Sequence, residues 1–395
     1  MQLPLVAVAI VSALAIAYCP APWSAVLLSA AALLVAYAVT AKRTAAKVAL
    51  ANIGAVCFAL ALFEAYLAHE ELRGDGTRLE GSITEGFTHL DDLLGYAPDA
   101  SARVTARKLH GDTLVYDVVY TIGPDGLRIA PPASDATLHG CVVFFGDSVT
   151  FGEGVNDDQT LPYQVGIKTG GRYKIYNFAF SGYGPHQMLA GLRAKWVERI
   201  AACKPTHFIN LIILAHVARV AGLTGWDRHG PRFRLDRDGM PVQDGHFDTP
   251  ATLLGHWAPP SWVVYALDRC YTWQQFFGRT RNPNEADLAL LIGVVQEAER
   301  FTRARYPDSE FHVFLWDGGE DPRERRIATA LAKAKIPVHL LSSAIPDFAA
   351  DWKQYVLSPY DLHPNPLLHE RLAEYVVRRV LVSKVPSKDV GDQRP

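Results

Sequence analysis

The chain has 395 residues, of which 49% are hydrophobic, and its formal net charge is −2. This length and composition allow one large globular domain plus further segments, and they argue against a disordered or fibrous protein. The charge is nearly balanced and no basic stripe is present, so nucleic acid is excluded as a partner. The five cysteines show neither CxxC nor cysteine–histidine metal spacing. We therefore expect neither a disulfide framework nor a zinc site.

Residues 1–70 are predicted to be a membrane anchor of about three helices. The apolar stretches are Leu3 to Tyr18, Trp23 to Thr40 and Val48 to Ala68. The third has 21 residues, and at about 1.5 Å per residue it reaches about 32 Å, enough to cross a bilayer core. The charges between the second and third stretches are all positive: Lys42, Arg43 and Lys47. This loop is expected to be cytoplasmic, which puts the rest of the chain on the other side.

A cleaved signal peptide is the alternative to an intact anchor. However, the start Met1-Gln2 lacks the positive charge of such a signal, and two more apolar stretches follow the first. A lipoprotein signal at Cys19 fits poorly, because bulky Tyr18 precedes the cysteine.

Residues 71–137 are predicted to form a small β-rich lead-in. Alternating apolar residues on both sides of His110-Gly111-Asp112 predict a β-hairpin, and Gly123-Pro124-Asp125-Gly126 predicts a turn. From residue 138 to 384, short apolar runs typical of buried parallel strands alternate with helical patterns. The runs are 141–145, 174–178, 207–214, 311–316 and 338–341, and the helical segments are 186–202, 285–305, 323–335 and 366–382. Repeated βαβ units predict a parallel sheet with helices on both faces.

Residues 221–284 interrupt this alternation and are interpreted as an insertion with a hairpin around Asp236 to Gly239. Long insertions at the carboxyl ends of strands often form substrate walls or lids. Its tryptophans could stack on sugar rings, although aromatic residues more often form core. They are Trp226, Trp257, Trp262 and Trp273. Residues 385–395 are expected to be a disordered tail.

The strongest chemical signal is Gly146-Asp147-Ser148, which directly follows an apolar run. A serine at the carboxyl edge of a parallel sheet lies where open α/β sheets bind ligands. An isolated Gly-Asp-Ser is more often only a tight turn and helix cap. A serine nucleophile needs a base held by a third group. Downstream, His363 could accept the Ser148 proton while Asp361 fixes the imidazole tautomer, although an Asp and a His beside proline can also be a plain helix-entry loop.

The Gly146-Asp147-Ser148 motif and the segment around His363 resemble conserved sequence blocks of the SGNH (GDSL) hydrolase family, and the resemblance covers residues 140–383. The resemblance implies that Ser148 is the nucleophile, that Gly182 in the block 177–184 is an oxyanion-hole glycine, and that the Asp361-Leu362-His363 block completes the triad. It further implies a flavodoxin-like three-layer α/β/α domain with no metal and no organic cofactor. The lead-in resembles the segment that precedes this domain in membrane-anchored bacterial members, at Asp91 to Pro98 and at Gly126-Leu127-Arg128. A multi-pass inner-membrane protein with a periplasmic catalytic domain is expected.

Two departures from the family pattern concern the site. Only Leu362 separates Asp361 from His363, where the family usually has two residues, and this weakens the role of Asp361 more than that of His363. The family's asparagine after the third strand is replaced here, and His216 is the candidate side-chain donor to the oxyanion; a histidine simply satisfied at the strand end is the alternative. Arg219 could bind an anionic group of the substrate, with a surface salt bridge as the alternative.

The predicted reaction is hydrolysis of an ester through an acyl-enzyme on Ser148, with His363 as general base. The expected substrate is an acylated, for example acetylated, glycan or a lipid-linked molecule of the cell envelope. One alternative is an O-acyltransferase that modifies an exported polysaccharide; three helices are too few to carry an acyl donor across, so it would need a membrane acyl-donor partner. The other alternative is a non-catalytic glycan-binding or assembly protein.

Overall fold

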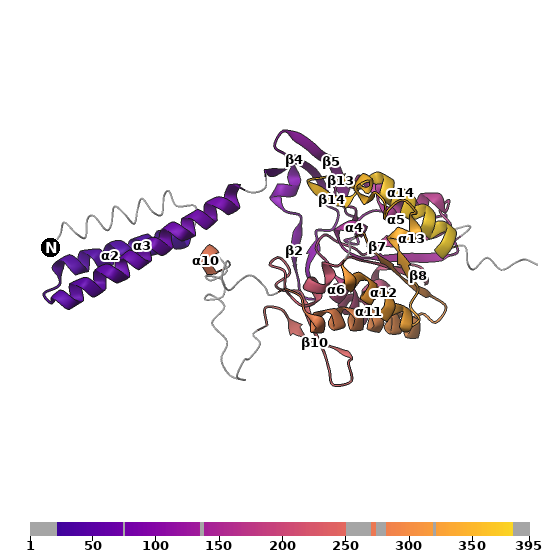
Figure 1. Cartoon of the computed structure of the whole chain (residues 1–395). Coiled ribbons are helices and arrows are strands. Elements are labelled where there is room, and N and C mark those ends of the chain that lie inside the picture. Colours follow the sequence, from indigo (N-terminus) through magenta and orange to yellow (C-terminus); the bar gives the residue numbers. More distant parts are fainter. Residues whose placement is uncertain are drawn as a thin grey trace, which may run out of the picture. The chain divides into compact units, whose positions relative to one another are not determined.

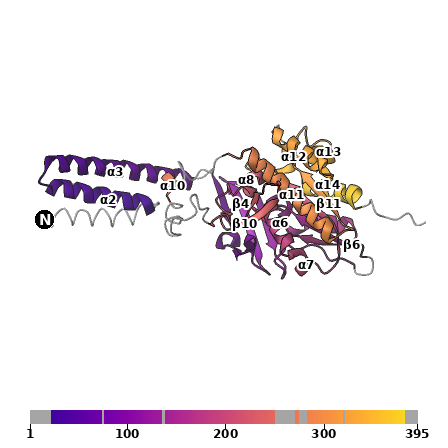
Figure 2. The ribbon, with the colours of Figure 1, turned by 90° about the horizontal axis from the view of Figure 1, so that it is seen from below.

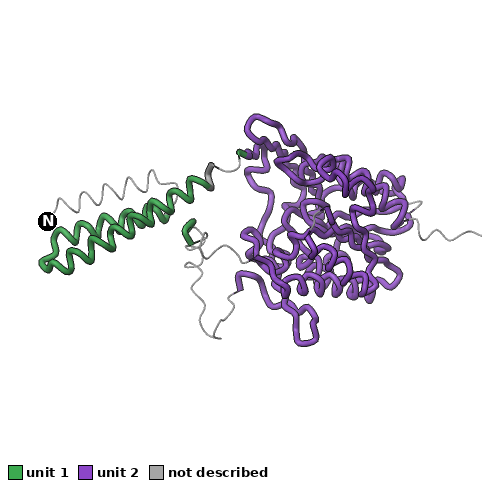
Figure 3. Tube along the Cα trace, in the orientation of Figure 1, with its two compact units in different colours: residues 1–76, 250–281 green, residues 77–249, 282–395 purple. Residues whose placement is uncertain are grey.

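The computed structural model describes residues 22–73, 76–134, 138–249, 270–273, 282–318 and 321–381. The chain divides into two units (Figure 3). The first comprises residues 1–76 and 250–281, and the second comprises residues 77–249 and 282–395. The predicted β-rich lead-in and the α/β domain therefore lie together in the second unit, while part of the predicted insertion belongs to the first.

Two long apolar helices make up most of the described part of the first unit. They are α2 (Pro22–Thr40) and α3 (Thr44–Arg73), and they pack side by side as a hairpin (Figures 1 and 2). A Cβ atom added to Gly54 of α3 would lie 3.3 Å from Val35 of α2, so a glycine allows the close approach. The segments Trp23–Thr40 and Thr44–Glu70 are long and apolar enough to cross a membrane. The first predicted stretch, Leu3 to Tyr18, lies outside the described residues.

The single charge of the third apolar stretch, Glu64, is fully buried in the first unit. Its carboxylate accepts hydrogen bonds from the backbone N–H groups of Tyr271 and Thr272, both at 2.6 Å, in the short helix α10 (Tyr271–Trp273). A buried carboxylate requires such partners. These insertion residues therefore contact α3.

A five-stranded parallel sheet forms the centre of the second unit. Its strands are β6 (Gly140–Phe145), β7 (Tyr173–Asn177), β8 (Pro205–Ile212), β11 (Glu310–Leu315) and β12 (Val338–Leu340). From one edge to the other, they come second, first, third, fourth and fifth along the chain, and every neighbouring pair is parallel. This is the flavodoxin-like doubly wound order. The predicted fold class is confirmed.

Helices cover both faces of this sheet, because the apolar side chains of each central strand alternate between two cores. Val143 and Phe145 of β6 face one core and Val142 and Phe144 the other. The first core is closed by α6 (Pro185–Arg193), α7 (Trp196–Ile200), α8 (His216–Val220), α11 (Glu285–Arg305) and α12 (Pro322–Lys333). The second is closed by α5 (Leu161–Lys168), α13 (Leu341–Ala344), α14 (Pro366–Tyr375) and the π-helical turn η6 (Val376–Val380).

The lead-in adds antiparallel strands to the second unit. β4 (Arg103–His110) and β5 (Thr113–Thr121) form the predicted hairpin, and β1 (Thr77–Glu80) pairs with β4. A separate pair consists of β2 (Thr88–Asp91) and β3 (Gly95–Pro98), after the 3₁₀ turn η1 (Ser82–Glu85). Lead-in residues such as Tyr120 share a core with Phe151 and Phe180, which follow β6 and β7. The lead-in thus packs on the loops at the carboxyl ends of these two strands.

The remaining elements of the second unit are short. In the insertion, β9 (Pro231–Leu235) and β10 (Pro241–His246) form the predicted hairpin. Near the C-terminus, β13 (Val356–Ser358) pairs antiparallel with β14 (Asp361–Pro364). The other turns are α4 (Ser148–Phe151), η3 (Asp157–Gln159) and η5 (Trp352–Tyr355).

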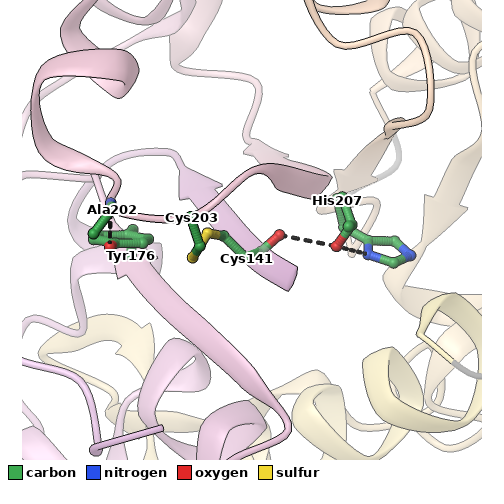
Figure 4. Close-up of a disulfide and its surroundings, with 6 residues drawn as sticks. Cys141, Tyr176, Ala202, Cys203 and His207 are labelled. Atoms are coloured by element: carbon green, nitrogen blue, oxygen red, sulfur yellow. Dashed lines mark hydrogen bonds between the residues drawn. A yellow bond between two sulfur atoms is a disulfide. The ribbon is translucent and has the colours of Figure 1, made fainter. Parts of the chain in front are cut away.

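A disulfide joins Cys141, at the start of β6, to Cys203, just before β8, with the Cα atoms 5.9 Å apart (Figure 4). Beside it, the Ala202 N–H donates to the Tyr176 hydroxyl at 2.8 Å. We expected no disulfide from the sequence, and this expectation is wrong. The two cysteines are 62 positions apart, and only the pairing of β6 with β8 brings them together.

Candidate active site

The nucleophile candidate Ser148 stands at the end of β6, where the strand turns sharply into α4. Asp147 caps this turn, and its carboxylate accepts the Val149 N–H at 3.0 Å. A Cβ atom on Gly146 would lie 2.2 Å from Thr150 Oγ1, so the turn requires glycine. The sheet order reverses between β6 and β8, and ligands bind at such a switch point. Ser148 therefore stands where this fold places its ligands.

The structure brings Ser148, His363 and Asp361 together in one chain of contacts. The Ser148 hydroxyl lies 2.8 Å from His363 Nε2, and His363 Nδ1 lies 2.6 Å from Asp361 Oδ1. The same oxygen also accepts the His363 backbone N–H at 3.0 Å. Asp361 and His363 lie two residues apart on the extended strand β14, so their side chains point to the same face. The short Asp-to-His spacing is therefore compatible with a triad.

The electrostatics of the three groups follow from these contacts. Burial lowers the pKa of His363, but its hydrogen bond with Asp361 and the negative charge of Glu153 outweigh burial, so the net shift is upward. Burial raises the pKa of Asp361, and its hydrogen bonds with His363 and Lys108 outweigh that effect, so this carboxyl titrates below its usual range. The structure thus favours an ionised Asp361 beside a basic imidazole.

Gly182 lies in the loop after β7 with a φ of 82°, in the left-handed region. A Cβ atom there would lie 2.4 Å from the Tyr96 hydroxyl and 2.7 Å from Trp226 Nε1, so a larger residue does not fit. The Tyr96 hydroxyl also donates to the Ser181 carbonyl at 2.7 Å, which fixes the loop from the lead-in side. The glycine is required here by both its backbone conformation and its surroundings.

His216 follows β8 as expected, and its ring lies beside Asp147, the residue before the nucleophile. The side chain is fully buried; its Nε2 lies 3.2 Å from Asp147 Oδ2, and its Nδ1 accepts the Ile213 N–H at 3.4 Å. Burial lowers the pKa of His216 despite the neighbouring Asp147. The predicted donation from His216 to the oxyanion stays a prediction.

Arg219 lines the site, but its guanidinium is engaged within the protein. Nη1 donates to Asp147 Oδ2 and to the Tyr183 carbonyl, both at 2.7 Å. Burial raises the pKa of Asp147, and His216 and Arg219 outweigh it, so this carboxyl also titrates below its usual range. The predicted binding of a substrate anion stays a prediction, and the ion pair found for Arg219 is buried instead of exposed at the surface.

Three residues of the site were not singled out as site residues from the sequence: Lys108, Glu153 and Arg128. Lys108 donates from Nζ to Asp361 Oδ2 at 2.8 Å. Glu153 accepts the Ser181 hydroxyl at 2.8 Å, and its carboxylate lies 3.9 Å from His363 Nε2. His363 therefore has a carboxylate on each side of its ring.

Arg128 holds the loop that follows the nucleophile. Its side chain is fully buried; Nη1 donates to the carbonyls of Phe151 and Gly152, and Nη2 donates to that of Val155. Nε pairs with Asp157 at 3.0 Å. The only signal for this role in the sequence was the resemblance of Gly126-Leu127-Arg128 to the lead-in segment of membrane-anchored family members.

A cavity of about 550 Å³ opens over Ser148 and His363. Its walls are mainly apolar or aromatic: Val149, Ile213, Leu214, Trp316, Trp352, Tyr360 and Leu362. Lys108, Arg219 and Glu324 add charge. Among the described residues, no cluster of His, Cys, Asp or Glu side chains could hold a metal ion. The described site is thus a serine and histidine at the floor of a largely apolar cavity.

Comparison with known proteins gives matches among solved structures alone. No family model and no curated protein matches the chain. One match is a protein described as a GDSL-like lipase from Parabacteroides merdae, 12% identical over 63% of this chain and 98% of that chain, with a TM-score of 0.34. Another is a lipolytic protein of the G-D-S-L family from Desulfitobacterium hafniense, which is 13% identical over 60% of this chain and 98% of that chain, with a TM-score of 0.35. An acetylxylan esterase from Geobacillus stearothermophilus also matches; it is 13% identical over 62% of this chain and 95% of that chain, with a TM-score of 0.34.

Proposed function

We propose that this protein is a serine-dependent ester hydrolase anchored in a membrane. The observation that carries the proposal is the contact chain from the Ser148 hydroxyl through His363 to Asp361 at 2.8 and 2.6 Å. A serine activated by a histidine that a carboxylate orients is the arrangement for acyl transfer. The position of Ser148 at the switch point of the sheet and at the floor of a cavity supports the same reading.

In the proposed reaction, Ser148 Oγ attacks the carbonyl carbon of the ester while His363 Nε2 takes the hydroxyl proton. The tetrahedral oxyanion accepts hydrogen bonds from the backbone N–H groups of Ser148 and Gly182. Collapse breaks the bond to the alkoxy group, which leaves as the alcohol with the proton from His363. Water then attacks the acyl-enzyme, His363 takes its proton and passes it to Ser148, and the carboxylic acid leaves. Asp361 stays ionised and stabilises the imidazolium throughout.

The substrate that we propose is an acylated glycan or a lipid-linked molecule on the outer side of the bacterial inner membrane. The two long apolar helices support a membrane location, and the positive residues between them support a cytoplasmic turn. The disulfide Cys141–Cys203 supports an extracytoplasmic catalytic unit, because disulfides persist in oxidising compartments. The aromatic walls of the cavity suit the face of a sugar ring.

An O-acyltransferase working with a membrane acyl donor is the second candidate. It uses the same acyl-enzyme, with a sugar hydroxyl in place of water. The observation that favours it is the membrane hairpin on the same chain, which suits work beside a membrane partner.

The test is the hydrolysis of p-nitrophenyl acetate by the full chain in detergent, compared with Ser148→Ala and His363→Ala. Ser309→Ala is the matched control, since Ser309 precedes β11 at the opposite end of the sheet and its hydroxyl donates to the Tyr306 carbonyl. We expect both site variants to lose at least a hundredfold in kcat and the control to be unchanged. Turnover that appears only when a sugar acceptor and acyl donor are supplied would favour the transferase. An active wild type whose Ser148→Ala variant is equally active would overturn both candidates, and a chain that binds glycan without turnover would identify a binding protein.

A further inference from the structure

A lysine lies on the packed face of the lead-in hairpin. Along β4 the buried residues are Val104, Ala106 and Leu109, and the exposed ones are Arg103, Thr105 and Arg107. Lys108 continues the inward-facing series of positions 104 and 106, because side chains alternate along a strand. The pairing register shifts between Lys108 and Leu109, so a bulge turns the strand at this point. A lysine in such a position requires a partner inside the protein.

That partner is the second oxygen of Asp361. Lys108 Nζ donates to Asp361 Oδ2 at 2.8 Å, while Oδ1 accepts both hydrogen bonds from His363. The Asp361 side chain is 2% exposed and that of Lys108 is 21% exposed, so solvent screens this ion pair much less than it screens a surface pair. The lysine and the histidine therefore hold the carboxylate from both oxygens.

The hairpin that carries Lys108 is itself fixed to the catalytic loops. The His110 ring stacks on Tyr360, directly before Asp361, with ring centroids 3.7 Å apart. On the neighbouring strand, the Tyr120 hydroxyl accepts the Gly154 N–H at 2.9 Å, in the loop after the nucleophile. These contacts set the position of the lysine relative to both Ser148 and Asp361.

We propose that Lys108 is a positioning residue for the proposed hydrolysis, which holds Asp361 oriented toward His363. The inference rests on the proposed function and extends it, because it makes the lead-in a working part of the active site. Asp361 faces His363 and Lys108, with Tyr116 of β5 nearby; the charged groups near His363 are Asp361, Glu153 and Asp147. Lys108 is therefore the positive group that faces the Asp361 end of this mainly acidic cluster.

Two consequences separate this role from a merely structural one. First, without Lys108 the Asp361 carboxylate loses one of its two anchors, and kcat is expected to fall about 10- to 100-fold because the base is less well aligned. Second, only the Asp361 carboxylate separates the Lys108 ammonium group from the His363 imidazole, so this positive charge disfavours protonation of the imidazole. Its removal should raise the pKa of His363 and move the acid limb of kcat/KM to higher pH by about half a unit to one unit.

The experiment compares the full chain in detergent with Lys108→Met and Lys108→Arg, using p-nitrophenyl acetate between pH 5 and pH 9. The Lys108→Arg variant keeps the positive charge, so it should retain most of the wild-type kcat and the wild-type acid limb of kcat/KM. The matched control is Arg107→Met. Arg107 precedes Lys108 on the opposite, exposed face of β4, so this variant should change neither kcat nor the acid limb of kcat/KM. Melting temperatures report folding, and Lys108→Gln replaces Lys108→Met if the methionine variant does not fold.

A second readout keeps failure of this inference apart from failure of the proposed function. The rate at which a fluorophosphonate labels Ser148 measures activation of the serine without any natural substrate. A wild type that is active and labelled, with a Lys108→Met variant unchanged in kcat, labelling rate and acid limb, would overturn the role of Lys108 alone. A rise in KM with unchanged kcat would also overturn it, since Lys108 would then contact substrate. A wild type with neither turnover nor labelling would overturn the proposed function, and this inference with it.

Discussion

Replacing Glu153 by glutamine is expected to lower the pKa of His363 and so extend activity to lower pH. The Glu153 carboxylate lies 3.9 Å from His363 Nε2, and its charge favours the protonated imidazole. Glutamine has nearly the same shape, and its carbonyl oxygen can still accept the Ser181 hydroxyl. The substitution therefore removes a charge and leaves the geometry in place.

The size of the shift follows from the distance and the exposure of the carboxylate. Two unit charges about 4 Å apart interact by about 1 kcal/mol in water and about 4 kcal/mol at an effective dielectric constant of about 20. The Glu153 side chain is 26% exposed, so solvent screens the pair and a value toward the lower end applies. Since one pKa unit corresponds to about 1.4 kcal/mol, we expect a decrease of about one unit.

The assay is the pH dependence of kcat/KM for wild type and Glu153→Gln. Protonated His363 cannot act as a base, so activity is lost as the pH falls through its pKa, and the acid limb of the variant should lie about one unit lower. Glu324→Gln is the control, because Glu324 lines the same cavity and the charges that shift the pKa of His363 are those of Glu153, Asp361 and Asp147. An acid limb that stays in place, or one that moves upward, would refute the reasoning.

Three further predictions concern stability and the first unit. Cys141→Ser with Cys203→Ser should lower the free energy of unfolding by about 3 to 4 kcal/mol, measured by chemical denaturation, because the bridge closes a loop of 62 residues. Burial lowers the pKa of His339 to about 4 and that of His369 to about 3. In the unfolded chain both imidazoles become protonated near pH 6.5. The free energy of unfolding and Tm should therefore fall as the pH drops from 6.5 toward 4. Glu64→Ala should speed amide hydrogen exchange at Tyr271 and Thr272, measured by mass spectrometry, because the Glu64 carboxylate accepts both of these N–H groups at 2.6 Å.

Much of the fold could be predicted because its signals are local. The apolar runs at 142–145 and 311–315 are buried on both sheet faces, and such runs separated by helical patterns leave few topologies. The candidate triad was predictable for a related reason. Ser148 follows a strand and His363 precedes a helix, and both positions can be recognised from a few neighbouring residues.

The contacts that were missed are those between segments distant in sequence. Lys108 and Asp361 are separated by 253 positions, and the only local signal was a lysine at an inward-facing strand position. The prediction for His216 placed the residue correctly at the end of β8, but its position along the chain does not determine which way the ring points. The ring lies against Asp147, with Nε2 3.2 Å from Asp147 Oδ2, and Nδ1 accepts the Ile213 N–H.

In the proposed mechanism, Ser148 is a nucleophile that His363 activates. The most direct measurement is peptide mapping of the full chain after reaction with a fluorophosphonate, together with the reaction rates of wild type, Ser148→Ala and His363→Ala. We expect a single adduct on Ser148 in wild type, none in Ser148→Ala, and a rate at least a hundredfold lower in His363→Ala. An adduct on another residue, or a His363→Ala variant that reacts as fast as wild type, would contradict this mechanism.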